Sequence, residues 1–174
     1  SKREIELLEI AGNIVYQTHK YLEPYIKEGI KTIELDKLAE DFIRSKDATP
    51  SFKGYEGFPY TLCISVNSEI VHGFPSDRVL KNGDIVSIDI GACYKGYHGD
   101  SAWTYVVGEV DEEKKYLLEH KKKSLFIGLE KVKGNSKSIL KLNVLVLIVK
   151  MALTCLFIFG FNLKDIIYVE IATI

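Results

Sequence analysis

Two neighbouring runs of strand-forming residues each carry one aspartate, and this pair most constrains how the chain can fold. The runs are residues 85–94 and 97–107, and a Lys-Gly dipeptide joins them. A two-residue connection that contains glycine predicts a β-hairpin. Pairing the strands backward from this turn puts Asp89 opposite Ala102. Since side chains alternate between the faces of a sheet, Asp89 and Asp100 are predicted to be diagonal neighbours on one face.

The two acids lie among residues that rarely surround a charge. Ile88 and Ile90 flank Asp89. Two carboxylates held close together repel each other unless a cation lies between them. A divalent metal ion in that position relieves the repulsion and also activates bound water. The sequence therefore predicts a metal site. Acids in strands also mark solvent-facing edge positions, and this alternative stays open from the pair alone.

Composition limits the class of protein. The chain has 174 residues, 47% hydrophobic and 27% charged, which is typical of one globular domain with one core. The formal net charge of −1 gives no basic field for nucleic acid, so we expect no nucleic-acid partner. Three cysteines without a CxxC pair indicate reduced thiols and a cytoplasmic location. No apolar leader follows the first residues, so no secretory signal is expected.

Apolar residues at helical spacing predict three helices. The first runs to Gly29, with Pro24 ending or kinking it. The second begins with Thr32 as its N-cap and runs to about Ser45, and the third covers about residues 111–133.

Strand signals lie between these helices. Residues 61–66 are predicted to form a strand, and Ile70-Val71 a short return strand. Residues 51–60 combine glycines, a proline and aromatic rings, which suits either a loop around a pocket or a surface turn whose rings are packed. Helices followed by hairpins predict an α+β fold with an antiparallel sheet covered by helices.

Four segments of the sequence resemble those of a known family and occur in the same order as in that family: residues 58–67, 71–75, 82–89 and 96–100. Together they resemble type I methionine aminopeptidases over roughly residues 4–133. The resemblance implies the pita-bread fold, in which two similar halves enclose a metal site. Other pita-bread peptidases, which cleave before proline, share the two aspartates, and the loop that contains Cys63 favours the methionine enzyme.

The resemblance implies roles for single residues. Asp89 and Asp100 would be two of five ligands to two divalent metal ions (Co, Mn, Fe or Zn), with Asp100 bridging both. Water activated there would attack the peptide bond after an N-terminal methionine of a nascent chain. His72 would hydrogen-bond near the scissile amide and assist the leaving nitrogen. The methionine pocket would be lined by Tyr55, Phe58 and Cys63.

The resemblance covers only the first half of that fold. The second half supplies two histidines and two glutamates, and none can be mapped here, since His120 lies in a lysine-rich helix and Glu170 lacks the following proline. We therefore assign 1–134 to an aminopeptidase-like half domain. The apolar tail, 135–174, is unrelated to the family pattern, and we interpret it as the product of a shifted reading frame.

Several alternatives remain beside the enzyme. A truncated, non-catalytic module that binds a partner fits the missing ligands equally. Lys150 interrupts the apolar tail and argues against a membrane span, because a central lysine costs about 2.5–3.5 kcal/mol on insertion scales. The oligomeric state stays open, since the tail or a second copy could cover the sheet surface that a half fold exposes.

Overall fold

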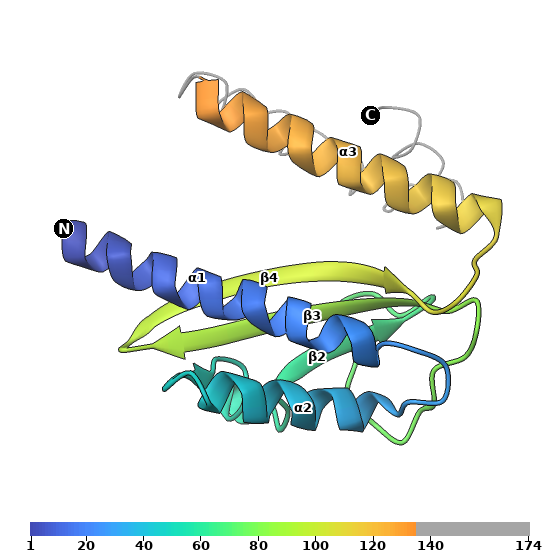
Figure 1. Cartoon of the computed structure of the whole chain (residues 1–174), viewed down its shortest axis with the longest axis horizontal. Coiled ribbons are helices and arrows are strands. Elements are labelled where there is room, and N and C mark those ends of the chain that lie inside the picture. The colour runs from blue at the N-terminus through green and yellow to red at the C-terminus, as the bar shows by residue number, and fades with distance from the viewer. Residues whose placement is uncertain (135–174) are drawn as a thin grey trace, which may run out of the picture. The chain divides into compact units, whose positions relative to one another are not determined.

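The computed structural model describes residues 1–134, and the chain divides into two units, residues 1–115 and 116–174 (Figure 1). Each unit is considered by itself. The predictions made for the tail, including its unrelated origin, fall outside the described residues. In the described part, no helix has both the length and the apolar character needed to cross a membrane.

The described residues contain three α-helices, α1 (Lys2–Leu22), α2 (Thr32–Arg44) and α3 (Glu112–Gly134), and the short 3-10 helix η1 (Glu23–Tyr25) follows α1. The predicted break of the first helix at Pro24 is confirmed, and the predicted end at Gly29 is wrong. The helix ends at Leu22, and the chain tightens into a 3-10 turn around Pro24, which has no N–H to continue the α-helical bonding.

The start of α2 also differs from its prediction. Lys31, not Thr32, is the N-cap residue, and the Glu34 carboxylate accepts its backbone N–H at 2.9 Å. Thr32 is buried, and its hydroxyl donates to the Ser76 carbonyl at 3.0 Å and accepts the Ser76 N–H at 2.9 Å. The threonine therefore ties a distant loop to the helix instead of capping it.

The sheet is antiparallel and is built around one long strand. Its strands are β1 (Thr49–Pro50), β2 (Leu62–Val66), β3 (Ile85–Tyr94) and β4 (Tyr97–Val106). A further 3-10 turn, η2 (Tyr55–Gly57), lies between β1 and β2. Strands β1 and β2 pair with different parts of β3, and β4 also pairs with β3.

The predicted hairpin is confirmed. Tyr94 pairs with Tyr97, and Asp89 faces Ala102. The connecting residues Lys95 and Gly96 have φ of 50° and 85°, the left-handed pair that a tight two-residue hairpin turn needs.

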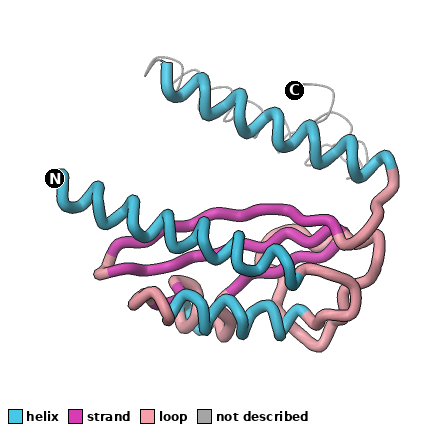
Figure 2. Tube along the Cα trace, viewed as in Figure 1, coloured by secondary structure: helices cyan, strands magenta, loops and turns pink. Residues whose placement is uncertain are grey.

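The predicted return strand at Ile70-Val71 is wrong. Val71 and His72 have φ of 43° and 60°, and such left-handed residues cannot continue an extended strand. Ile70 is 82% exposed, so its apolar side chain signals no burial here. The long connection between β2 and β3 is instead irregular, as Figure 2 shows.

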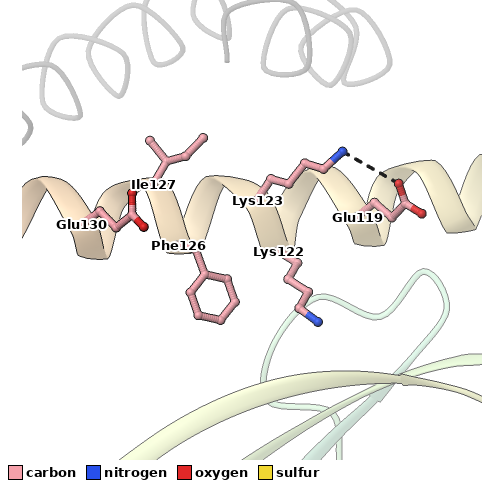
Figure 3. A pocket seen from close by; sticks show the side chains of 6 residues that line it. All are labelled: Glu119, Lys122, Lys123, Phe126, Ile127 and Glu130. Atoms are coloured by element: carbon pink, nitrogen blue, oxygen red, sulfur yellow. Dashed lines mark ion pairs between the residues drawn. The ribbon is translucent and has the colours of Figure 1, made fainter.

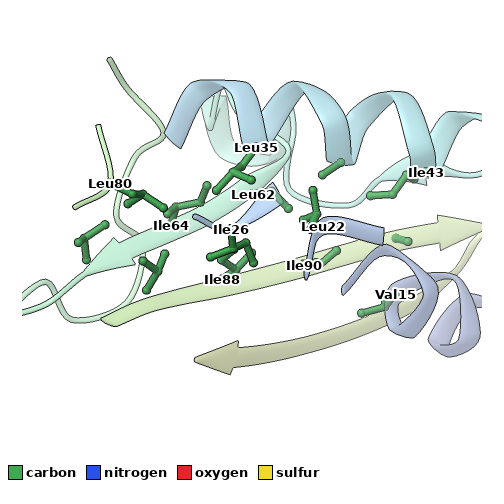
Figure 4. Packing of buried hydrophobic residues seen from close by; sticks show 14 of the residues in the cluster. Val15, Leu22, Ile26, Leu35, Ile43, Leu62, Ile64, Leu80, Ile88 and Ile90 are labelled. Carbon is green, nitrogen blue, oxygen red and sulfur yellow. The ribbon is translucent and has the colours of Figure 1, made fainter. Parts of the chain in front are cut away.

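The core lies on one face of the sheet. Helices α1 and α2 both cover this face (Figure 4). Side chains alternate between the two faces of a strand, so every second residue of β2 and β3 belongs to the hydrophobic core. The buried strand residues are Leu62, Ile64, Val66, Val86, Ile88, Ile90 and Ala92. The α+β class with helices on an antiparallel sheet is thus confirmed.

Candidate metal and substrate site

The two aspartates lie on the sheet face opposite the core. Asp89 pairs with Ala102, and Gly91 pairs with Asp100, so the two acids share a face one diagonal step apart. Burial raises the pKa of Asp89 to about 6, and the nearby Asp100 carboxyl adds a hydrogen bond and a like charge. Asp89 belongs to the strand between β2 and β4, so the solvent-facing edge alternative fails for it.

Oxygen ligands of this kind suit hard divalent cations. Burial is the largest cause of the raised pKa of Asp89, and the neighbouring carboxyl adds a repulsion that a bound cation would relieve. Within residues 1–134 no group of three or more His, Cys, Asp or Glu side chains is arranged to hold a metal ion. Alone, the two aspartates would make only a partial ligand set for such an ion.

His72 lies on the loop that runs back along β2. The next residue, Gly73, accepts the Ile64 N–H at 2.8 Å and donates to the Ser65 hydroxyl at 3.1 Å. A Cβ at Gly73 would collide with the Ile64 carbonyl, so only glycine allows this approach. His72 is thereby held near Asp89, where its charge acts to lower the pKa of that carboxyl.

Cys63 joins the aspartate face, directly opposite Asp89 in the pairing of β2 with β3. It is 6% exposed. Burial, followed by the charges of Asp89 and Asp100, raises the pKa of its thiol to about 11. Cys63 therefore presents a neutral, polarizable sulfur beside the acids.

The two aromatic residues predicted to line the pocket differ in their surroundings, since Phe58 is packed against other rings and Tyr55 is exposed. Phe58 makes edge contacts with Phe74 and Tyr60, with ring centroids 5.2 and 6.0 Å apart. Because Phe74 lies two residues after His72, these rings join the two loops. Tyr55 lies in η2 and is 68% exposed. The rings are packed against one another, and their role as a pocket wall stays a prediction.

The sequence reading missed a structural role of Asp36. This carboxylate is 5% exposed, and its Oδ1 accepts the Thr61 and Leu62 N–H groups at 2.9 and 2.8 Å. It fixes the start of β2, the strand that carries Cys63. In the sequence it looks like an ordinary acid in a first helical turn, so no signal marked it.

A second missed feature lies over the aspartate face. A Cβ at Gly91 would lie 2.6 Å from the ring of Phe52, so this ring covers β3 at the residue that pairs with Asp100. A glycine inside a strand marks such close approaches, and this signal was available. His98, which shares the acids' face, bonds through Nδ1 to the Ser51 hydroxyl at 2.9 Å.

A hollow runs along α3. Its described lining comes from that helix alone, as Figure 3 shows, with Lys123 paired to Glu119. The lining residues are Glu119, Lys122, Lys123, Phe126, Ile127 and Glu130. None of them belongs to the strands that carry the aspartates.

Comparisons with known proteins find methionine aminopeptidases among the relatives of this chain. Methionine aminopeptidase 1 of Bacillus subtilis is 56% identical over 135 residues, which are 78% of this chain and 54% of that protein. Methionine aminopeptidase of Clostridium perfringens is 49% identical over 131 residues, 75% of this chain and 53% of that protein. The chain spans about half the length of the curated relatives it matches.

Solved structures show the same fold. The methionine aminopeptidase of Thermotoga maritima superposes with a TM-score of 0.72 at 39% identity, covering 74% of this chain and 52% of that one. The prolidase of Pyrococcus furiosus gives a TM-score of 0.61 at 30% identity, with 68% and 34% covered. The model of metallopeptidase family M24 matches residues 6–144. The chain therefore belongs to metallopeptidase family M24.

Proposed function

We propose that this chain is part of a metal-dependent aminopeptidase that removes the N-terminal methionine from peptides and nascent proteins. The observation that carries the proposal is the placement of Asp89 and Asp100 on one sheet face, with His72 held near Asp89. The names of its relatives support methionine as the residue removed. The free cysteines of the described part, Cys63 and Cys93, are compatible with a cytoplasmic location.

Each residue has a part in this proposal. Asp89 and Asp100 would hold the two divalent ions, and such ions supply Lewis-acid polarisation of a carbonyl and acidify water. His72, close to the acids on its loop, would hydrogen-bond the scissile amide and assist the departing nitrogen. The neutral Cys63 thiol with the rings of Phe58 and Tyr55 would receive the methionine side chain.

A second candidate is a non-catalytic module that binds a peptide terminus or a partner. It is favoured by one observation, the absence of any cluster of three metal-ligating side chains in the described residues. A two-carboxylate site binds metal weakly, because affinity depends on the number and geometry of ligands. The two candidates therefore differ in metal affinity and in turnover.

Calorimetric titration of the full chain with Mn²⁺ or Co²⁺, beside hydrolysis of a Met-Gly peptide, separates them. If the chain is an aminopeptidase, it should bind two ions and hydrolyse the peptide. Both properties should be lost in Asp89→Asn and Asp100→Asn. Asp77→Asn is the matched control, because Asp77 is an exposed acid paired with Lys31. Wild-type protein without turnover would leave the binding module as the function of this polypeptide.

The tail leads to a further proposal. We infer that residues 135–174 replace the family's second half through a shifted reading frame. Translation of the other frames downstream of the Gly134 codon is expected to reveal a His-Gly-x-Gly stretch and two glutamates. Their absence from all frames would show that the tail is genuine protein.

A further inference from the structure

Helix α1 lies along β4 and meets it at Gly99, the residue before Asp100 (Figure 1). A Cβ at Gly99 would lie 2.6 Å from the Ala11 carbonyl carbon and from the Gly12 nitrogen. Any larger residue would push the helix backbone away from the strand. The helix and the strand are thus in backbone contact immediately before the acid.

His19, two turns further along α1, meets β4 at the residue after Asp100. Its Nε2 lies 3.1 Å from the Ser101 carbonyl oxygen, and its Nδ1 lies 2.9 Å from the Tyr105 hydroxyl. Because a carbonyl only accepts, Nε2 carries the hydrogen and Nδ1 accepts from Tyr105. The carbonyl oxygen of His19 itself is farther from that hydroxyl, at 3.5 Å.

The protonation states of both partners agree with this arrangement. His19 is 8% exposed, and burial lowers the pKa of its imidazole, which favours the neutral ring. Burial raises the pKa of Tyr105 to about 12, so its hydroxyl keeps the proton that it donates. Each ring nitrogen of His19 therefore has one partner on β4.

These contacts bracket Asp100. Side chains alternate along β4, so Gly99 and Ser101 share the face opposite Asp100. We propose that His19 is a positioning residue that, through Ser101 and Tyr105, fixes the β4 backbone so that Asp100 is held toward Asp89. The inference rests on the proposed metal site. It assigns to α1 a function in the site in addition to its packing in the core.

The physical reason is the weak support of β4 in the described part of the chain. Its only strand partner among these residues is β3. A strand held along one edge shifts more easily than one held along both, and a small displacement of a ligand lowers metal affinity. A buried histidine with two fixed partners removes this freedom at Ser101.

The test compares three variants of the full chain. His19→Leu fills the space without a donor, and His19→Gln restores an amide N–H that can reach the Ser101 carbonyl. Thr18→Val is the matched control, because Thr18 is the adjacent buried polar residue and its hydroxyl donates to the Ile14 carbonyl within α1. Mn²⁺ affinity, amide hydrogen exchange of residues 99–102, and stability in urea are measured for each.

We expect His19→Leu to weaken Mn²⁺ binding about tenfold or more, as loss of a residue that orients a ligand does. Its exchange at residues 99–102 should accelerate beyond what the loss of global stability explains. His19→Gln should recover most of both properties, and Thr18→Val should leave both unchanged. If His19→Leu does not fold, Tyr105→Phe, which removes only the hydroxyl bonded to Nδ1, is expected to give a smaller change in the same direction.

Unchanged Mn²⁺ affinity in His19→Leu, or exchange that accelerates uniformly over β3 and β4, would overturn the proposal and leave His19 as a packing residue. Failure of the metal site itself has a different result. Wild-type protein that binds no Mn²⁺ removes the proposed function, while the exchange comparison still decides whether His19 holds the strand.

Discussion

The two faces of the central sheet are built from the same strands, but one face carries buried apolar side chains and the other carries neighbouring acids. On the core face, Ile88 and Ile90 are fully buried under α1 and α2. On the other face, Asp89 lies beside Cys63 and near Asp100, and loops approach it. One face gains stability from apolar area removed from water, and the other face accepts repulsion between its acids. The comparison indicates that alternate residues of a strand have different tasks: one set stabilises the fold, and the other set forms the candidate site.

Adjacent substitutions in β3 should show this difference most strongly. Ile88→Ala deletes a fully buried side chain, and we expect a loss of about 2–5 kcal/mol in the free energy of unfolding. Ser87→Ala removes a hydroxyl that lies 2.8 Å from the Thr104 hydroxyl, with an expected loss of about 0.5–1.5 kcal/mol. Urea unfolding measures both. Equal losses at the two positions would contradict the separation of the faces.

The loop over the aspartate face depends on backbone contact, where the core face depends on side-chain packing. Gly73→Ala would drive a Cβ into the Ile64 carbonyl, and we expect a loss of about 1–3 kcal/mol together with displacement of His72. The control is Gly128→Ala in α3, where a Cβ meets no atom within 4 Å. Alanine there should be neutral or stabilising by up to about 1 kcal/mol. Urea unfolding and the NMR shifts of His72 check the result, and a neutral Gly73→Ala would show that the loop is not held by this contact.

Features that depend on neighbouring residues along the chain were predictable. The hairpin register followed from a Lys-Gly turn and from alternation, so the shared face of Asp89 and Asp100 could be read directly. The apolar period also found α1 and α2. The place of His72 came only through the family resemblance, since a lone histidine carries no such information.

Features that depend on distant parts of the chain were not predictable. Ile70-Val71 has the composition of a strand, yet the loop there turns through left-handed residues to bring Gly73 against β2. Asp36 looked like a helix-start acid and instead binds the backbone at the start of β2. In both cases a tertiary contact overrides the local preference, and nothing in the neighbouring residues records it.

The smallest effect on stability, and the sharpest test of the aspartate face, comes from Asp100→Asn in the metal-free protein. Removing the like charge and the shared hydrogen bond should lower the pKa of Asp89 from about 6, while burial, the largest cause of the shift, keeps it above the ordinary 3.8. Carbon-13 NMR of the Asp89 carboxyl follows this titration, and Asp77→Asn is the control that leaves it unchanged.

The sign of the pH dependence follows from the raised pKa. The folded protein binds a proton at Asp89 more tightly than the unfolded chain does, so this contribution to stability is complete below about pH 3.8 and is lost as pH rises through about 6. The Asp100→Asn variant should lose less stability than the wild type between about pH 3.8 and 6, and should therefore be more stable than the wild type at pH 7. Because Asp89 is only half-buried and solvent screens the pair, we expect a gain below about 1 kcal/mol. An Asp89 titration that does not respond to Asp100→Asn would show that the two carboxyls do not interact, and the case for a shared cation at this face would fail with it.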